Sequence, residues 1–394
     1  MASSNPGSDE EDVLVQEPNA YVRILTLNRP RQLNVISIKM FSQLTELVLA
    51  YDNDANVKLV IVKGNGRAFC AGADIVTLAR HHFDDNRRYG VKLAQLAYTL
   101  CYVIATNSKP QVSILNGIVM GAGAGISIHG RFRVVTENTM FAMPEAIVGG
   151  FPDVGASYFL SRLPGFFGEY LGLTAARLDG PEMLAMGLAT HFVPSTNLAL
   201  LEEALVSQVG SRTSSTCDAA FISAIIDEYS QRPAPEETSA CRKMHVIDKC
   251  FSHKTVEEIL SALEEESKIN TNGDDWLDST IQSLKMASPM SLKITLRSIR
   301  EGRTQGVGEC LVRDYRMACH VLQGKISKDA AEGVRALLIE KDGNPKWDPS
   351  KLELITDQMV EHYFGKLDDV EELKIPARPN ILPVSRSVTT KAKL

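Results

Sequence analysis

Short apolar segments of strand-like composition alternate with segments of helical periodicity through the first half of this 394-residue chain. In the region that follows Ser37, apolar residues recur with the period of a helix, which Ser37 can cap. Strands alternating with helices form βα units and mostly parallel sheets, so we predict an α/β fold with ligands bound where strands end. The strand patterns, rich in β-branched and apolar residues, cover residues 13–16, 21–27, 59–62, 112–115 and 132–135.

The character of the chain changes near residue 197. Strand patterns fade there, and long helical stretches follow, for example at residues 255–268 and 275–286. We expect this second half to be a helical region that packs on the first. The sequence thus predicts four regions, which are a disordered N-terminus (1–12), an α/β catalytic core (13–196), a mainly helical region (197–370) and a flexible tail (371–394).

Composition excludes several classes of protein. The net charge of −6 and the pI of about 5.8 argue against a nucleic-acid partner, which would favour a basic face. The seven cysteines are scattered, form no CxxC pair and are odd in number, so we expect a reducing compartment and no disulfide framework. The eight histidines are equally dispersed, and we expect no metal site. No apolar run reaches the ~18 residues that would span a membrane, so we expect no membrane partner.

The two ends of the chain carry different information. The N-terminal residues are acidic and have no apolar core, which is unlike a signal or transit peptide. The last three residues, Ala392-Lys393-Leu394, resemble the Ser-Lys-Leu type of peroxisomal address, and the preceding Pro-, Ser- and Thr-rich segment would keep them accessible. We therefore expect a peroxisomal import receptor as a partner and a peroxisomal location. If the tripeptide occurs by chance, the protein is cytoplasmic.

Two glycine-rich loops follow predicted strands. Residues 64–75 (GNGRAFCAGADI) contain small side chains that let a backbone approach a ligand closely, and Asp74 can cap a following helix; a simple tight turn would look the same. Residues 116–127 (NGIVMGAGAGIS) open a predicted helix, where outward N–H groups suit an oxyanion or a phosphate. The second loop does not complete the GxGxxG pattern, which disfavours a dinucleotide-dependent oxidoreductase.

Two carboxylates, Glu145 and Asp153, lie eight residues apart among apolar and small neighbours. Burial raises the pKa of a carboxyl group, and two carboxyls in different surroundings can divide the roles of acid and base. The alternative is structural, because Asp and Glu beside Pro and Gly are also common as helix caps and turn residues.

Taken together, these segments resemble the crotonase superfamily, and within it most closely the plant 3-hydroxyisobutyryl-coenzyme A (CoA) hydrolases. The resemblance extends from about residue 13 to about residue 365, and four motifs occur in the family's order and spacing. The motifs of the superfamily are LNRP with LN (27–34), AFCAGAD (68–74), NG with GAGAG (116–125) and MPE (143–145). The features of the hydrolases are FPDVG (151–155), GLATHFV (187–193) and EGVRA with KD and PKW (332–347).

This resemblance implies a spiral of ββα units with a helical C-terminal region. It implies that an acyl-CoA thioester binds with its carbonyl oxygen between the backbone N–H groups of Ala73 and Ala122. It further implies that Glu145 and Asp153 are catalytic and touch the substrate, that no separate cofactor is needed, and that a homo-oligomer is possible. Further substrate contacts are expected at Ala71, Asp74, Ile75, Ala97 and Ala122.

Three departures from the family pattern bear on the activity. Hydratases of the superfamily carry a second glutamate where this chain has Gly125, so hydrolysis is favoured over hydration. Ala97 stands where relatives place an acidic or amide side chain on the substrate hydroxyl, and Ala122 where they usually have glycine. We expect hydrolysis of 3-hydroxyisobutyryl-CoA to 3-hydroxyisobutyrate and CoA, a step of valine breakdown. The alternatives are hydrolysis of another short or branched acyl-CoA and a catalytically weakened paralogue that binds acyl-CoA.

Overall fold

The computed structural model describes residues 11–80, 83–211, 218–269, 275–368 and 370–377. The strands of this part are β1 (Val13–Gln16), β2 (Val22–Leu27), β3 (Leu59–Gly64), β4 (Ala68–Cys70), β5 (Gln111–Leu115), β6 (Ile118–Met120), β7 (Phe132–Val135), β8 (Met140–Ala142), β9 (Leu178–Asp179) and β10 (His191–Phe192). The α-helices are α1 (Ile38–Asn53), α2 (Ile75–Arg80), α3 (Phe83–Ala105), α4 (Ala122–Ile128), α5 (Ala156–Leu160), α6 (Phe167–Thr174), α7 (Gly180–Ala185), α8 (Leu198–Gly210), α9 (Ala219–Tyr229), α10 (Met244–Phe251), α11 (Val256–Ile269), α12 (Asp275–Met286), α13 (Pro289–Gly302), α14 (Val307–Gln323), α15 (Asp329–Val334) and α16 (Asp357–Phe364).

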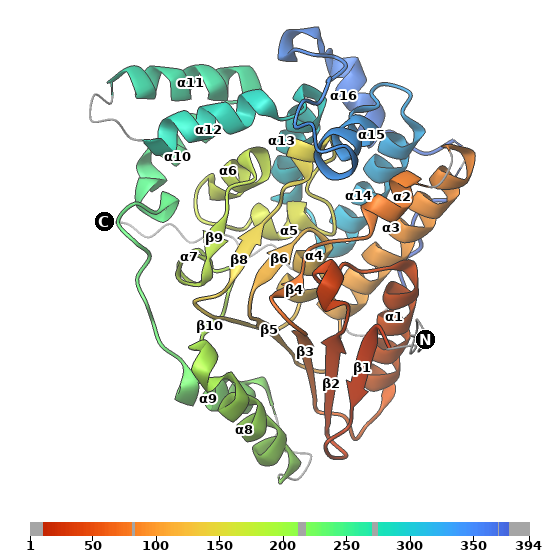
Figure 1. Ribbon diagram of the computed structural model, residues 1–394, viewed down its shortest axis with the longest axis vertical. Helices are drawn as coiled ribbons and strands as arrows, with labels where there is room; N and C mark the ends of the chain where they lie inside the picture. Colours follow the sequence, from red (N-terminus) through yellow and green to blue (C-terminus); the bar gives the residue numbers. More distant parts are fainter. Residues whose placement is uncertain (1–10, 81–82, 212–217, 270–274, 369, 378–394) are drawn as a thin grey trace, which may run out of the picture.

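The strands form two sheets that the chain visits in turn (Figure 1). One sheet has the order β1-β2-β3-β5-β7-β10 and is parallel apart from β1, which runs antiparallel to β2. The other has the order β4-β6-β8-β9, with β9 antiparallel to β8. The pairs β3 and β4, β5 and β6, and β7 and β8 each place one strand in each sheet. This arrangement confirms the predicted α/β fold and the expected spiral of ββα units.

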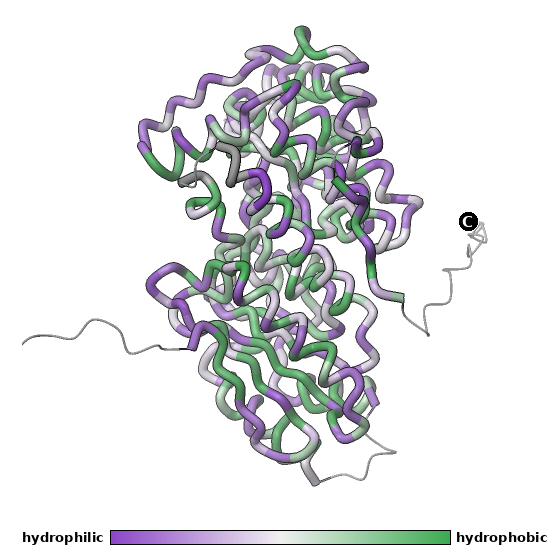
Figure 2. Tube along the Cα trace, turned by 90° about the vertical axis from the view of Figure 1, so that its right-hand side faces the viewer, coloured by the Kyte–Doolittle hydropathy of each residue, from purple (hydrophilic) through white to green (hydrophobic). Residues whose placement is uncertain are grey.

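The six-stranded sheet is covered on both faces, which explains its continuous apolar strands. Side chains alternate across it, as the period of two requires. In β2, Val22 and Ile24 belong to the core formed with α8 and α9, whereas Leu25 and Leu27 belong to the main core. Figure 2 shows these strands as the most hydrophobic part of the trace in the lower half of the molecule.

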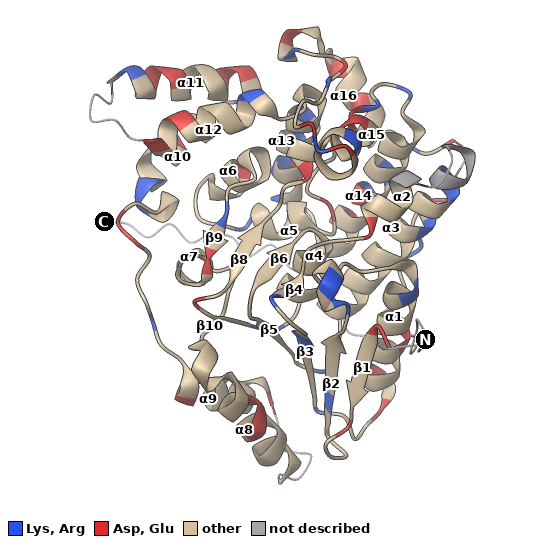
Figure 3. Ribbon diagram, in the orientation of Figure 1, with Lys and Arg blue, Asp and Glu red and all other residues tan. Residues whose placement is uncertain are grey.

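The helical second half divides between two places. Helices α8 and α9 cover one face of the six-stranded sheet, while α10 to α16 pack around the opposite end of the molecule (Figure 1). Within the second group, α14 lies along α3, and α13 packs on α5 and α6. Acidic and basic residues are mixed over these outer helices (Figure 3). The prediction of a helical C-terminal region is confirmed, and its separation into two groups could not be read from periodicity.

The described residues include parts of both predicted terminal regions. The last strand of the described residues ends at Phe192, before the predicted boundary at residue 197. Residues 1–10 and 378–394, including Ala392-Lys393-Leu394, lie outside the described residues. Near these limits, the Asp12 carbonyl accepts a hydrogen bond from Asn28, and Glu372 pairs with Arg316 of α14. Within the described part of the chain, none of the helices has both the length and the apolarity needed to cross a membrane.

Candidate active site

The first glycine-rich loop turns from β4 into α2. The Ile36 N–H donates to the Gly72 carbonyl at 2.9 Å, and the Asp74 N–H donates to the Ile36 carbonyl at 3.1 Å. These two bonds make a parallel bridge between Ile36 and Ala73, and such a bridge leaves the N–H of Ala73 on the opposite side. Among the described residues, no hydrogen bond uses that N–H.

The other predicted contacts in this loop have local structural partners. The Asp74 carboxylate accepts from the Thr77 N–H at 3.1 Å, so it caps α2 as predicted, and it lies 3.6 Å from Arg29. The Ala71 N–H donates to the Leu33 carbonyl, and the Ile75 N–H donates to the Ala73 carbonyl. Their amides are therefore engaged in holding the loop, and only the half-buried surfaces of Ala71, Asp74 and Ile75 remain for a ligand.

The second glycine-rich loop lies against the first. Gly121 has φ +51° and precedes α4, whose first residue is Ala122. A Cβ added to Gly121 would lie 2.9 Å from Oε1 of Glu145 and 3.7 Å from Cα of Gly72. The N–H of Ala122 belongs to the first turn of a helix and has no partner within it. The two glycine-rich segments and Glu145 therefore meet at Gly121. A side chain at Gly121 would collide with the carboxylate of Glu145.

Glu145 follows β8 in the chain and is the first residue of the 3₁₀ helix η2 (Glu145–Val148). Its backbone carbonyl accepts from the Gly150 N–H at 2.8 Å, which fixes the turn that follows. Its Oε2 is buried and has no hydrogen-bond partner among the described residues. Burial, reinforced by the nearby Asp153, raises the pKa of Glu145 well above its usual range.

Asp153 lies in the turn before α5, and its Oδ2 accepts a hydrogen bond from the hydroxyl of Tyr98 at 2.7 Å. Burial raises the pKa of Asp153 to about 6, while the bond from Tyr98 favours its charged form. Because Glu145 and Asp153 interact, they titrate as a pair, and the pair retains a proton at a pH where an isolated carboxyl would lose it. This state suits a site that must both accept and donate protons near neutral pH.

Helix α3 supplies a residue that the sequence reasoning missed. Ala97 is buried on α3 with 4% of its surface exposed, and it offers no polar group. The next residue, Tyr98, presents its hydroxyl to Asp153 instead. A signal was available, because the resemblance expects a polar side chain from this helix and Tyr98 is the adjacent polar residue.

Gly125 lies in α4 where a side chain would collide with its surroundings. A Cβ there would be 2.6 Å from Cβ of Val154 and 2.9 Å from Sγ of Cys101. These are closer than any real Cβ contact, so a carboxylate side chain at this position would require the turn after Asp153 to move. The space in which a hydratase would hold its second glutamate is closed here by Val154.

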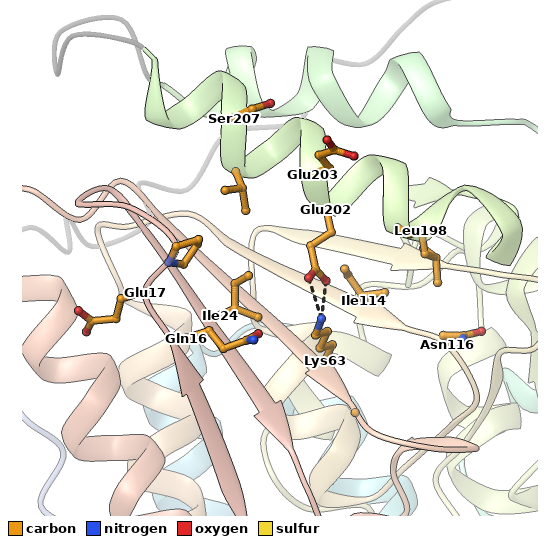
Figure 4. Close-up of a pocket in the computed structure, with 14 residues that line it drawn as sticks. Gln16, Glu17, Ile24, Lys63, Ile114, Asn116, Leu198, Glu202, Glu203 and Ser207 are labelled. Atoms are coloured by element: carbon orange, nitrogen blue, oxygen red, sulfur yellow. Dashed lines mark hydrogen bonds and ion pairs between the residues drawn. The ribbon is translucent and has the colours of Figure 1, made fainter.

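A separate cavity of about 830 Å³ lies between the six-stranded sheet and α8 (Figure 4). Lys63 and Glu202 form an ion pair of 2.6 Å within it. Its apolar lining includes Ile24, which belongs to the core on the α8 and α9 face. None of the predicted site residues lines this cavity, so it is distinct from the site around Glu145.

Comparison with known proteins extends these observations. The sequence pattern of the family described as enoyl-CoA hydratase/isomerase matches residues 22–364. The chain is 59% identical to 3-hydroxyisobutyryl-CoA hydrolase 1 of Arabidopsis thaliana, over 95% of this chain and 97% of that protein. Two solved structures are also similar. A carnitinyl-CoA dehydratase from Mycobacterium thermoresistibile has a TM-score of 0.80 at 33% identity, covering 94% of this chain and 100% of its own. An enoyl-CoA hydratase from Rhodobacter sphaeroides 2.4.1 has a TM-score of 0.78 at 30% identity, covering 90% and 98%.

Proposed function

The chain belongs to the enoyl-CoA hydratase/isomerase family, and on that premise we propose that it hydrolyses 3-hydroxyisobutyryl-CoA to 3-hydroxyisobutyrate and CoA. The reaction is a step of valine breakdown. The identity of 59% with a hydrolase of that name, over nearly the full length of both proteins, supports the substrate.

One observation carries the proposal: at Gly121, the segments that carry the Ala73 and Ala122 amides lie beside the carboxylate of Glu145. When water or a carboxylate attacks a thioester carbonyl, negative charge develops on the carbonyl oxygen. Two N–H groups fixed in the backbone stabilise that charge without reorganising, and one such donor contributes ~10²–10³-fold in rate. The backbone supplies both donors, and we expect turnover to need no separate cofactor.

Glu145 and Asp153 divide the remaining work. Glu145, in its charged form, accepts the proton of the attacking water. The C–S bond breaks as the tetrahedral intermediate collapses, and the departing CoA thiolate takes up that proton from the pair of Glu145 and Asp153. Asp153, held by Tyr98, touches the substrate and shares the proton with Glu145 until it is transferred. In a second possible route, Glu145 attacks the carbonyl itself to form an anhydride that water then cleaves. Label on Glu145 after a single turnover in ¹⁸O-water would demonstrate the anhydride route, because attack of water on the carboxyl carbon of Glu145 in the anhydride leaves label on that residue.

Hydration is the competing reaction, because the two solved structures with high TM-scores are named as a dehydratase and a hydratase. Hydration of an enoyl thioester in this family uses a second glutamate at the position of Gly125. That position has no carboxylate and no room for one beside Val154. The carboxylate available here, Asp153, approaches from the turn before α5 instead.

Ala97 bears on the acyl group rather than on the chemistry. A pocket that lacks a hydrogen-bonding partner for the substrate hydroxyl loses much of its discrimination. Tyr98, the next residue of α3, donates a hydrogen bond to Asp153, and in our proposal these two polar groups contact the hydroxyl. A preference for another short or branched acyl-CoA, or binding without turnover, would mean that they do not.

Product analysis with a panel of esters tests the proposal. We expect thiol release that is fastest with 3-hydroxyisobutyryl-CoA and slower with propionyl-CoA and isobutyryl-CoA, which lack the hydroxyl. With crotonyl-CoA we expect no loss of the enoyl absorbance through hydration. Fast hydration without thiol release would replace the proposed reaction, and tight binding without either reaction would favour a binding paralogue.

We also propose that Ala392-Lys393-Leu394 directs the protein to peroxisomes through the import receptor. Deleting these three residues should leave a fluorescent fusion in the cytosol, while the full chain co-localises with a peroxisomal marker. Import that survives the deletion would contradict this proposal without affecting the enzymatic one. A homo-oligomer is a separate expectation, which light scattering of the purified protein measures.

A further inference from the structure

The turn that carries Asp153 is held through a single peptide group. The Val154 carbonyl accepts a hydrogen bond from Nε2 of His129 at 2.8 Å. The N–H of the same peptide group, on Gly155, donates to Oδ2 of Asp314 at 2.8 Å. Two side chains from different helices therefore grip the two ends of one peptide bond, immediately after the predicted catalytic carboxylate.

His129 comes from the end of the helix that starts at Ala122. It occupies the C-terminal cap of α4, and its ring also packs against Phe159 of α5. Burial lowers the pKa of His129 to about 4, so the ring is neutral near pH 7. Because the Val154 carbonyl can only accept, Nε2 must carry the proton of the neutral ring. His129 thus ties the helix that presents one amide donor to the turn that presents Asp153.

Asp314 comes from the helical second half. It is fully buried in α14, which lies along α3 and beside α5 (Figure 1). Burial raises the pKa of Asp314 to about 7, against the effect of Arg313. Its Oδ1 has no hydrogen-bond partner among the described residues, so a proton can reside there while Oδ2 keeps the bond to Gly155. The hydrogen bond from the Gly155 N–H to Oδ2 of Asp314 is therefore compatible with both protonation states of Asp314.

The turn at Val154 and Gly155 has a strained backbone, so it needs contacts that hold it in this conformation. Val154 has φ +53° and Gly155 has φ +79°. A β-branched residue in the left-handed region is rare, and such a conformation costs ~1–3 kcal/mol and persists only where the surroundings enforce it. Without His129 and Asp314, the turn could relax, and the side chain of Asp153 would change direction relative to Glu145 and Tyr98.

We propose that His129 and Asp314 are positioning residues that clamp the Val154–Gly155 peptide group and thereby fix Asp153 for the reaction. This inference rests on the proposed function. It gives α14 a role in the active site, since a residue 159 positions away in sequence sets the geometry of the turn. Neither side chain needs to touch the substrate.

Matched pairs of variants test the clamp. Asp314→Asn and His129→Gln keep an acceptor and a donor, respectively, whereas Asp314→Ala and His129→Ala remove them. We expect the two alanine variants to lose ~10- to 100-fold in kcat with little change in KM, because a displacement of about 1 Å can cost that much. The two conservative variants should restore most of the kcat. The double alanine variant should be no slower than the worse single one, since both act on one peptide group.

Hydrogen exchange of the peptide covering residues 151–159 gives a readout independent of turnover. Faster exchange in both alanine variants, with protection regained in Asp314→Asn, is the expected result. Glu169→Ala is the matched control, because it removes a fully buried carboxylate paired with Arg303 at 2.7 Å and should lower Tm while leaving kcat unchanged.

The outcomes separate the two proposals. Alanine variants that fold and keep the wild-type kcat would overturn the clamp, as would a loss of kcat equal to that of Glu169→Ala at matched Tm. If an alanine variant does not fold, the conservative variants still decide, because a loss of kcat in them despite a retained hydrogen bond contradicts the clamp. A wild-type protein without thiol release overturns the proposed function instead, and faster exchange in the alanine variants would then show a clamp without a catalytic role.

Discussion

Replacing Asp153 by asparagine should make the protein more stable and less active. The change preserves the shape of the side chain and an oxygen that can accept the hydrogen bond from Tyr98. In the wild-type protein this bond is 2.7 Å long. It removes a charge from a place where burial raises the pKa of the carboxyl from 3.8 to about 6. A buried carboxylate with a raised pKa lowers the stability of the folded protein, and active sites often retain such groups because the reaction needs them.

The magnitude follows from the pKa. A carboxyl whose pKa is higher in the folded than in the unfolded protein stabilises the fold below the unfolded value and loses that contribution as pH rises through the folded value. At about 1.4 kcal/mol for each pH unit, the charged form of Asp153 costs the fold ~3 kcal/mol above pH 6. The advantage of Asp153→Asn should therefore be absent near pH 4 and develop as the pH rises through 6.

Thermal unfolding at a series of pH values measures this effect. For a chain of this length, ~3 kcal/mol corresponds to a rise in Tm of roughly 4 °C at pH 8. The same variant should lose ~10²-fold or more in kcat for thiol release. Asp368→Asn, an exposed carboxylate far from the turn in sequence, is the control and should change neither quantity. An unchanged or lower Tm at pH 8, or an advantage that persists at pH 4, would refute the reasoning.

Three further predictions concern Tyr98, Gly125 and the dependence of the activity on a metal. Tyr98→Phe removes the donor that favours the charged form of Asp153, so the pKa of Asp153 should rise and the acidic limb of kcat/KM should move to higher pH; a limb that stays in place would contradict this. Gly125→Ala places a Cβ 2.6 Å from Val154, and urea unfolding should show a loss of ~1–3 kcal/mol together with reduced kcat. Because backbone amides supply the charge stabilisation, EDTA followed by gel filtration should leave thiol release unchanged, and lost activity restored by a metal would refute that expectation.

Much of the fold follows from local patterns. The strands predicted at residues 59–62, 112–115 and 132–135 and the helix after Ser37 occur within a few residues of the expected limits, because each has a clear apolar period. The two glycine-rich segments follow predicted strands as expected, but each also contains a short strand, β4 or β6, that was not predicted. The order of strands in the two sheets was not predicted, since periodicity does not specify pairing partners.

The predicted site residues were chosen because they stand in motifs, whereas the residues that hold them in place stand outside these motifs. Ala73, Ala122, Glu145 and Asp153 stand in short segments whose composition attracts notice. Tyr98 lies in an ordinary helical pattern and becomes significant only when α3 is seen beside the turn before α5. Asp314 contacts that turn across 159 residues, and a buried aspartate in an amphipathic helix has no sequence signal. Supports of this kind depend on long-range packing, which a single sequence does not reveal.

Steady-state thiol release from 3-hydroxyisobutyryl-CoA by the wild-type protein and Glu145→Gln tests the central claim most directly. Glu203→Gln, an exposed glutamate on α8, is the control. We expect rapid release by the wild type and the control, and a loss of ~10²–10⁴-fold in Glu145→Gln with acyl-CoA binding retained in calorimetry. Release by Glu145→Gln at the wild-type rate would show that the chemistry does not depend on this carboxylate and would contradict the account.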